Sequence, residues 1–306
     1  TGPSSSHTMG PRKAAEIFLE RHPEATAFKV TLYGSLAATG KGHMTNIAIT
    51  EVLQPVAPVE IIWEPKIFLP FHPNGMKFVS VDKEGKETDQ WVVFSIGGGA
   101  LAEESDGASS VNTPDVYSMN SMTEILQWCE RTGKSYWEYV KECEDSDIWD
   151  YLQEVWKTMQ NAVKRGLEQE GVLPGPLNLR RKASTYYIRA SGYKQSLQSR
   201  GLVFAYALAV SEENASGGVI VTAPTCGSCG VMPAVLYHLA KSREFSDTRI
   251  LRALATAGLV GNIVKTNASI SGAEVGCQGE VGVACAMASA AANQLFGGSP
   301  AQIEYA

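Results

Sequence analysis

Three serine hydroxyls, a threonine and an imidazole are concentrated at the start of the chain, where residues 2–8 read GPSSSHT. Gly10 and Pro11 then open a predicted helix, so this segment lies at the positive end of a helix dipole. Hydroxyls, backbone N–H groups and a helix N-terminus together suit the binding of a carboxylate. A serine-rich turn that only caps the helix is the simpler structural alternative.

Histidines could supply acid–base chemistry in the same part of the chain. Three of the five lie in glycine-, proline- or serine-rich loops, namely His7, His43 and His72, whereas His22 and His238 lie in segments with a helical pattern. Histidine is the side chain best suited to exchange protons near neutral pH. If the three loop histidines meet in one cleft, they form a general-base cluster; each one alone is typical of a surface loop.

Six cysteines without a signal peptide fit a reducing compartment and free thiols. Cys226 and Cys229 form a Cys-x-x-Cys motif, which fits zinc, a redox pair, cluster ligation or unligated thiols. Cys277 lies in a polar, glycine-rich stretch, residues 267–279, which we expect to be a loop that approaches a ligand closely. Cys285 follows in an alanine-rich helix, where we expect a packed core thiol.

The elements that must position these residues divide the chain in two. Residues 1–104 are predicted to form an α+β domain, and residues 121–306 a mainly helical domain. Residues 105–120 are polar and lack sustained periodicity, which predicts a linker. In the first domain we expect a long helix at residues 11–21 and a short helix from about Thr45. We expect its strands at residues 28–32, 59–63, 76–81 and 90–96.

Composition and charge exclude two classes of partner. The net charge of −6 comes from mixed charges without a basic run, so we expect dispersed charges and no face for nucleic acid. The longest weakly polar stretch, residues 281–292, is shorter than the roughly 20 apolar residues of a membrane span. We therefore expect a soluble protein that binds small molecules. The sequence begins without Met and ends soon after a helix start at Ser299 and Pro300, so we expect a fragment of a longer protein.

Seven motifs occur in the order in which the iron–sulfur L-serine dehydratases carry them, and the chain resembles that family from end to end. They read GPSSSHT, YGSL with TGKGH, HPNGM, SIGGG, EGVLPGPL, APTCGSCG and NASISGAEVGCQGEVG. The resemblance implies a β domain similar to an allosteric substrate-binding domain, followed by an α domain that holds a [4Fe–4S] cluster. It also implies the conversion of L-serine to pyruvate and ammonia, with the cluster acting as a Lewis acid on the serine hydroxyl.

The resemblance assigns roles to individual residues. His43 is expected to be the base that takes the α-proton, with His7 and His72 positioning the substrate. Cys277 matches the first of three cluster cysteines, and the family's other two have no counterpart in this sequence. The expected substrate ligands are hydroxyl and amide side chains of both domains: Ser4, Ser5, Ser6, Thr8, Asn74, Asn267, Ser269 and Ser271.

Two other functions fit parts of the sequence. A pyridoxal-phosphate serine dehydratase performs the same reaction through a lysine Schiff base, but the surroundings of Lys41 and Lys265 do not resemble that fold. A non-catalytic serine-binding module is the alternative for a chain that lacks cluster ligands. For the enzyme, we expect L-serine as the small-molecule partner, a cytoplasmic location, a homodimer, and neither nucleic acid nor membrane as a partner.

Overall fold

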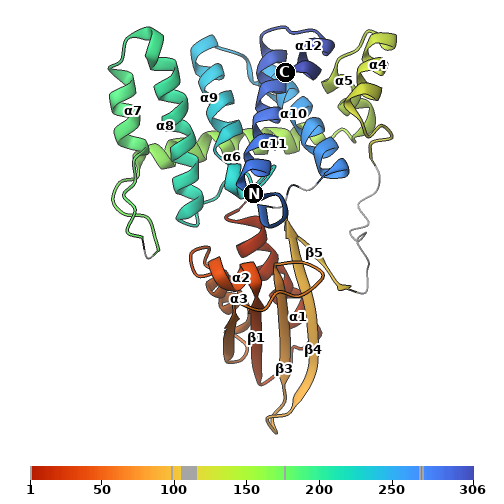
Figure 1. Cartoon of the computed structure of the whole chain (residues 1–306), viewed down its shortest axis with the longest axis vertical. Helices are drawn as coiled ribbons and strands as arrows, with labels where there is room; N and C mark the ends of the chain where they lie inside the picture. The colour runs from red at the N-terminus through yellow and green to blue at the C-terminus, as the bar shows by residue number, and fades with distance from the viewer. Residues whose placement is uncertain (1, 98, 105–115, 176, 269, 271) are drawn as a thin grey trace. The chain divides into compact units, whose positions relative to one another are not determined.

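The computed structural model describes every residue except 1, 98, 105–115, 176, 269 and 271, and describes residues 272–274 by their backbone alone. The described residues group into two compact units, one within residues 2–113 and 174–178 and the other within 114–173 and 179–306. Figure 1 shows a mixed α/β unit and a helical unit. The predicted fold class, an α+β domain followed by a mainly helical one, is confirmed.

A five-stranded sheet with the strand order β2-β1-β3-β4-β5 forms the first unit. The strands β1 (Ala27–Tyr33) and β2 (Val59–Glu64) run parallel. The strands β3 (Gly75–Val81), β4 (Glu87–Gly97) and β5 (Ala100–Ala102) extend the sheet through antiparallel pairs. The four strands predicted for this domain are therefore confirmed.

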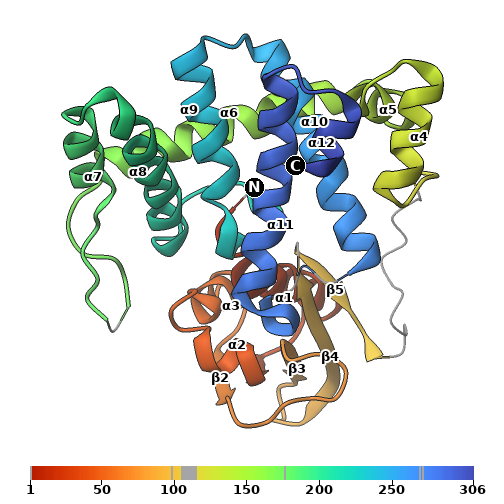
Figure 2. The same cartoon turned by 45° about the horizontal axis from the view of Figure 1, so that its top comes forward.

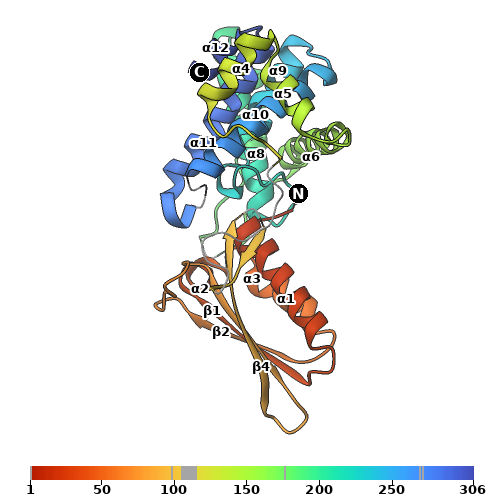
Figure 3. The ribbon, with the colours of Figure 1, turned by 90° about the vertical axis from the view of Figure 1, so that its right-hand side faces the viewer.

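Two helices, α1 (Gly10–Arg21) and α3 (Thr45–Leu53), cover one face of this sheet (Figure 3). Side chains along β1 alternate in burial, so Phe28 and Leu32 are both fully buried on the same face. Phe18 of α1 packs against Phe28, with ring centroids 6.1 Å apart. The core of the first unit therefore lies between the sheet and these two helices.

Two short segments at the helix starts carry residues of chemical interest. The π-helical turn η1 (Ser5–Met9) runs directly into α1. The short helix α2 (Gly34–Thr39) follows β1, and a turn connects it to α3. The turn η1 contains His7, and His43 lies in the turn between α2 and α3.

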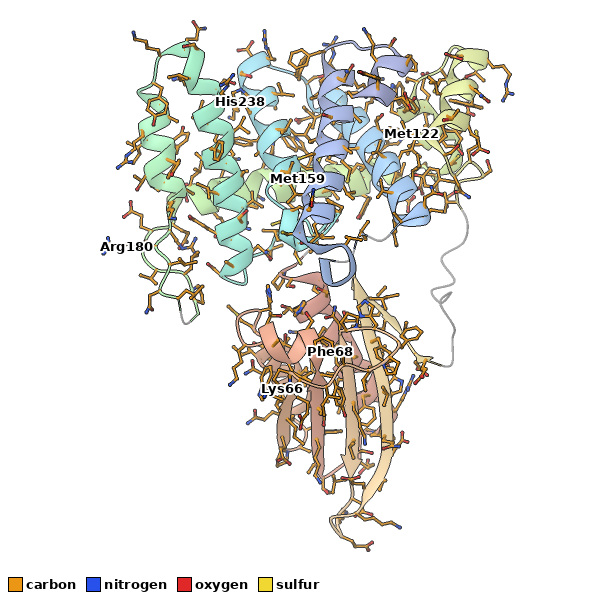
Figure 4. The ribbon with its side chains drawn as sticks, in the orientation of Figure 1. Lys66, Phe68, Met122, Met159, Arg180 and His238 are labelled. Carbon is orange, nitrogen blue, oxygen red and sulfur yellow. The ribbon has the colours of Figure 1, made fainter. Side chains whose placement is uncertain are left out.

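The long helix α6 (Ile148–Glu168) runs through the second unit. It packs against α7 (Ala183–Ser191), α8 (Gln195–Ala215), α9 (Val231–Arg243) and α10 (Asp247–Asn267), as Figure 2 shows. The buried side chains of α6 recur at helical spacing, which is the pattern of a helix with one face in the core. They include Leu152, Val155, Trp156, Met159, which is labelled in Figure 4, and Val163.

Further helices complete this unit. They are α4 (Met122–Thr132), α5 (Tyr136–Cys143), α11 (Gly272–Leu295) and α12 (Pro300–Tyr305). The hydroxyl of Tyr136, which is fully buried, donates to the carbonyl of Pro300 at 3.1 Å and so joins two segments far apart in the chain. Among the described residues, no helix has the length and apolar character that a membrane span requires.

The helix α11 differs from the sequence prediction. The glycine-rich stretch 267–279 is predicted to be one loop, but α10 ends at Asn267 and α11 already begins at Gly272. Gly276 has φ 68° and ψ 177°, a backbone conformation open essentially to glycine alone. Two helical pieces therefore meet at this residue, and Cys277 directly follows the kink.

Two further predictions have different outcomes. Cys285 is exposed, so the prediction of a packed core thiol at this position is wrong. The buried side of α11 at this level is formed instead by Ala284 and Ala288. The predicted linker, residues 105–120, lies mostly outside the described residues, and the predicted domain bounds stay predictions.

Candidate functional site

The segment before α1 forms one tight turn. The Ser4 carbonyl accepts backbone hydrogen bonds from Thr8 at 2.9 Å and Met9 at 3.0 Å, and Ser4 Oγ accepts from the His7 N–H at 3.4 Å. Ser4 and Ser5 are each 3% exposed. The turn therefore buries two of the predicted carboxylate ligands and fixes His7 at the start of α1.

His7 and His43 lie side by side, with ring centroids 4.8 Å apart. Two threonine hydroxyls hold their backbones, because Thr8 donates to the His43 carbonyl at 2.7 Å and Thr45 donates to the His7 carbonyl. The backbone of each histidine is thus held by a threonine that lies within two residues of the other histidine in sequence. We call this pair of bonds the threonine clasp. The structure brings together two of the three loop histidines.

The two rings differ in their hydrogen bonds. Both nitrogens of His7 are engaged, Nδ1 with Ser6 Oγ at 2.9 Å and Nε2 with Ser35 Oγ at 3.4 Å. His43 is exposed, and its ring has no hydrogen-bond partner among the residues that the structure describes. His43 is therefore the ring of the pair that is open to an incoming molecule.

The surroundings keep both rings neutral. Burial, and then the charge of the adjacent His43, lower the pKa of His7 to about 4, although a hydrogen bond with Ser35 acts in the opposite direction. Desolvation also lowers the pKa of His43. An imidazole whose pKa is lowered is neutral at pH 7, and the neutral form is the one that accepts a proton.

His72 belongs to a second polar group of the same unit. It is 5% exposed, and its Nδ1 accepts from the Asn74 N–H at 3.1 Å. Asn74 Nδ2 donates to the Ser95 carbonyl at 3.1 Å, and the Ser95 N–H donates to the Asn74 carbonyl at 3.0 Å. Asn74 Oδ1 and Ser95 Oγ are buried and lack hydrogen-bond partners among the described residues. Such atoms indicate a place where water or a ligand binds.

Gly10 lies between these two groups. A Cβ atom at Gly10 would lie 2.2 Å from Ser95 Oγ, and the Gly10 N–H donates to the Ser5 carbonyl. Glycine is needed here because any side chain would collide with Ser95. The turn that carries His7 and the buried Asn74–Ser95 pair therefore meet at the start of α1.

Of the site residues predicted in the helical unit, those that the structure describes form no comparable group. Asn267 is exposed, and its Nδ2 donates to the carbonyls of Asn120 at 2.7 Å and Ile263 at 2.9 Å, which secures the end of α10. Ser269 and Ser271 lie outside the described residues. Cys277 is exposed. Only Asn267 and Cys277 can therefore be placed in the structure.

The Cys-x-x-Cys motif begins on the short helical turn η3 (Cys226–Ser228), and Cys229 directly follows this turn. Cys229 is 2% exposed, and burial, followed by the charge of Cys226, raises its pKa to about 12. Glu280 of α11 packs so closely on Gly227 that a Cβ atom there would lie 2.3 Å from its Oε2. Because the thiolate is the form that binds metals and attacks disulfides, these features favour the unligated alternative.

The cysteines do not assemble a metal site in the described part of the chain. No three His, Cys, Asp or Glu side chains there lie close enough to hold a metal ion. Cys277 could supply one thiolate, but a [4Fe–4S] cluster is held by several cysteines. The described residues alone therefore do not form the complete ligand set that the resemblance implies.

Three polar residues of this region are missing from the sequence prediction: Ser35, Thr45 and Ser95. Ser35 contacts the His7 ring, Thr45 forms half of the threonine clasp, and Ser95 pairs with Asn74. Ser35 and Ser95 lie inside the YGSL and SIGGG motifs, so membership of these motifs could have identified both as site residues. Thr45 has the residue type and position of an ordinary helix start, so the sequence does not indicate that it contacts His7.

Replacing Thr45 with valine is expected to lower the free energy of unfolding by about 1–3 kcal/mol, because the His7 carbonyl loses its partner in a buried place. Thr45 is fully buried, and valine keeps its shape. Chemical denaturation measures the change. Thr50→Val on the same helix is the matched control, since the Thr50 hydroxyl has no hydrogen-bond partner in the described parts of the chain. Equal losses in both variants would show that the clasp bond adds no stability.

Two family models match the chain. The model described as Serine dehydratase beta chain matches residues 1–61, and the model described as Serine dehydratase alpha chain matches residues 75–306. The chain is 38% identical to the L-serine dehydratase of Haemophilus influenzae and 39% identical to L-serine dehydratase 1 of Escherichia coli, in both cases over 99% of this chain and 78% of the relative. It is 32% identical to the L-serine dehydratase of Helicobacter pylori, over 94% of this chain and 74% of that relative.

Fold and comparisons agree on the class of protein. A mixed α/β unit with a neutral histidine pair and a helical unit occur in one polypeptide, which carries matches to both chains of one enzyme family. This defines a single-chain enzyme. The chain belongs to the serine dehydratase family.

Proposed function

We propose that this protein converts L-serine to pyruvate and ammonia. The observation that carries the proposal is the pair of neutral histidines, in which the ring of His7 is held by hydrogen bonds and that of His43 is open. All three relatives named above are L-serine dehydratases. A neutral, accessible imidazole is the group that abstraction of the α-proton of serine requires.

The proposed reaction is an elimination. The neutral His43 ring accepts the α-proton of serine, and the bond between the β-carbon and the hydroxyl oxygen breaks. The departing hydroxyl leaves as water with the proton that His43 took up, so the ring returns to its neutral form and the overall charge is conserved. The remaining aminoacrylate tautomerises to an imine, which water hydrolyses to pyruvate and ammonia.

His7 and His72 are proposed to position the substrate. Ser6 and Ser35 bind both nitrogens of the His7 ring, which orients the ring against His43. A neutral neighbour also lets His43 take up a proton without the repulsion that a charged neighbour would add. His72 is proposed to orient Asn74, whose free carbonyl oxygen could accept from the substrate's ammonium group.

The remaining substrate ligands stay proposals. For the carboxylate we propose the hydroxyls of the N-terminal turn, of which Ser6 and Thr8 are more exposed than the others. The full set proposed for the substrate is Ser4, Ser5, Ser6, Thr8, Asn74, Asn267, Ser269 and Ser271.

We further propose that the working enzyme carries a [4Fe–4S] cluster, with Cys277 as one ligand. When bound, such a cluster supplies a Lewis acid to the departing hydroxyl. The exposure of Cys277 beside the kink at Gly276 supports the proposal, because an exposed thiol can reach a ligand that the helix does not cover. We also propose a homodimer located in the cytoplasm. The cysteines of the described part of the chain form no disulfide, which agrees with a reducing compartment.

The protein extended to the full length of its relatives, of which this chain covers 78%, and reconstituted with iron and sulfide under anaerobic conditions, is expected to form pyruvate from L-serine. Pyruvate is measured by coupling to lactate dehydrogenase. The acid limb of the kcat/KM profile is expected below pH 6.5, the ordinary pKa of histidine. Because the surroundings lower the pKa of both rings, the base stays neutral until the pH falls below that value, and protonation then abolishes activity.

The pH of this acid limb gives an apparent pKa of the His7–His43 pair and not of either ring alone, because interacting groups titrate together. An acid limb at or above pH 6.5 contradicts the lowered pKa of the base. Serine binding without pyruvate formation, in protein that has taken up iron, would instead favour the non-catalytic binding module.

A further inference from the structure

The charges of the helical unit are segregated, contrary to the prediction of dispersed charges. Residues 171–211 contain six Lys or Arg and no Asp or Glu, and residues 142–156 contain six Asp or Glu and no Lys or Arg. The basic residues are Arg180, which is labelled in Figure 4, Arg181, Lys182, Arg189, Lys194 and Arg200. The acidic residues are Glu142, Glu144, Asp145, Asp147, Asp150 and Glu154.

The basic segment also exposes large apolar side chains. It forms the α7–α8 hairpin, where Ile188 is 67% and Phe204 is 66% exposed. A set of this kind on a monomer marks an interaction surface, and Tyr, Phe and Arg are enriched in the centres of protein interfaces. The exposed apolar side chains of the hairpin are Tyr186, Tyr187, Ile188, Tyr193, Leu197 and Phe204.

The helix α6 separates the two charged segments. It begins inside the acidic segment, and it packs on α7 and α8 of the basic one. The 12 residues of α6 beyond the acidic segment, 157–168, span about 18 Å at 1.5 Å per residue, which exceeds the screening length of about 8–10 Å at ordinary salt. Figure 1 shows α5 and the α7–α8 hairpin at opposite sides of the helical unit. Within one chain, the two segments are therefore too far apart to neutralise each other.

We propose that the α7–α8 hairpin docks on the acidic segment of a second copy of this chain, and that the second hairpin docks in return on the first copy. Two copies of the chain whose α6 helices lie antiparallel make both contacts at once, and this arrangement closes a two-fold symmetric dimer. Hairpin against hairpin would place the exposed positive charges of Arg189, Lys194 and Arg200 opposite those of the second copy, and like charges disfavour such contact. This inference rests on the homodimer of the proposed function and names its surface.

Charge reversal tests the contact from both sides. Lys194→Glu with Arg200→Glu reverses the hairpin, and Asp145→Lys with Glu154→Lys reverses the acidic segment. All four residues are exposed. In analytical ultracentrifugation the unchanged chain is expected at twice its mass of 32.9 kDa. Each double variant is expected to weaken the dimer at least about tenfold, and an equimolar mixture of the two double variants is expected to restore it, because opposite charges again face each other.

Lys83→Glu with Lys86→Glu is the matched control, since it makes the same change of charge on the exposed turn between β3 and β4. It is expected to leave the dimer unchanged. Ile188→Asp is expected to weaken the dimer without altering any of the four reversed charges. Circular dichroism identifies any variant that fails to fold.

Three outcomes would overturn the proposal. The first is an unchanged chain that stays monomeric up to about 100 µM at low salt, a range in which weak specific contacts still form. The second is a dimer whose stability neither double variant changes. The third is a monomer whose hairpin binds vesicles of anionic lipid, which would assign the surface to a membrane. Mass is the readout, so a protein inactive on serine can still confirm the contact.

Discussion

Replacing His43 with glutamine is expected to lower kcat for pyruvate formation by about 10²- to 10⁴-fold, the usual contribution of a general base. Glutamine keeps a polar side chain of similar reach but cannot take up the α-proton. KM is expected to change little, because the backbone of residue 43 stays bound to Thr8. Steady-state kinetics with L-serine, run anaerobically on protein of equal iron content, measures the effect.

The same kinetics on two other variants separates the roles of the histidines. His22→Gln is the control, since His22 lies in the same unit but pairs with Asp89 at the surface, 2.9 Å away. It is expected to leave kcat unchanged. His7→Gln is expected to lower kcat less than His43→Gln, because His7 orients the base instead of accepting the proton. If His43→Gln keeps full activity, a group other than His43 is the base.

Replacing Cys277 with alanine is expected to reduce both bound iron and pyruvate formation by at least about tenfold. Loss of a residue that only supports a metal ligand already costs about 10- to 100-fold in metal affinity or activity, and loss of a ligand should cost no less. Iron and sulfide content and the broad visible absorption after anaerobic reconstitution measure the first effect independently of the second.

Cys285→Ala is the matched control for this experiment. Cys285 is the other exposed cysteine on α11 and carries the same thiol eight positions further along the helix. It is expected to keep its iron and its activity. If both variants retain the iron content of the unchanged protein, Cys277 is not a cluster ligand, and the proposed cofactor loses its support from this chain.

The strand β1 could be predicted because the side chains of one of its faces are fully buried and those of the other are not. Along β1 the apolar residues Phe28, Val30 and Leu32 alternate with more polar neighbours, which gives the period of a strand. The helix starts were equally visible, for example where Pro11 follows Gly10. These features depend on local sequence and on burial, and both can be read from the residues themselves.

The histidine pair could be predicted only in part. The loops around His7 and His43 identified both residues, but their meeting depends on the turn η1 and on Thr45, which join segments far apart in the chain. His72 occupies the same unit, yet its ring bonds to Asn74. Sequence pattern names the candidates, whereas long-range hydrogen bonds decide which of them touch.

The helix α11 shows why burial was harder to predict there. Around Cys285 the sequence is rich in alanine and glycine, so no polar residues mark the outer side of the helix. Without a polar side, the pattern cannot tell which thiol faces the core. The predicted loop at 267–279 failed for a related reason, since its glycines are typical of loops but here permit a kink within a helix at Gly276.

The threonine clasp ties the assembly of the histidine pair to the folding of the whole first unit. Its two hydrogen bonds join residues 35 and 38 positions apart in the chain. Bringing such distant segments together costs chain entropy, which must be offset by the contacts of the sheet and helices packed around them. A chain that is still being synthesised, or one whose first unit has opened, therefore has no paired histidines. The pair exists only in protein that has completed this fold.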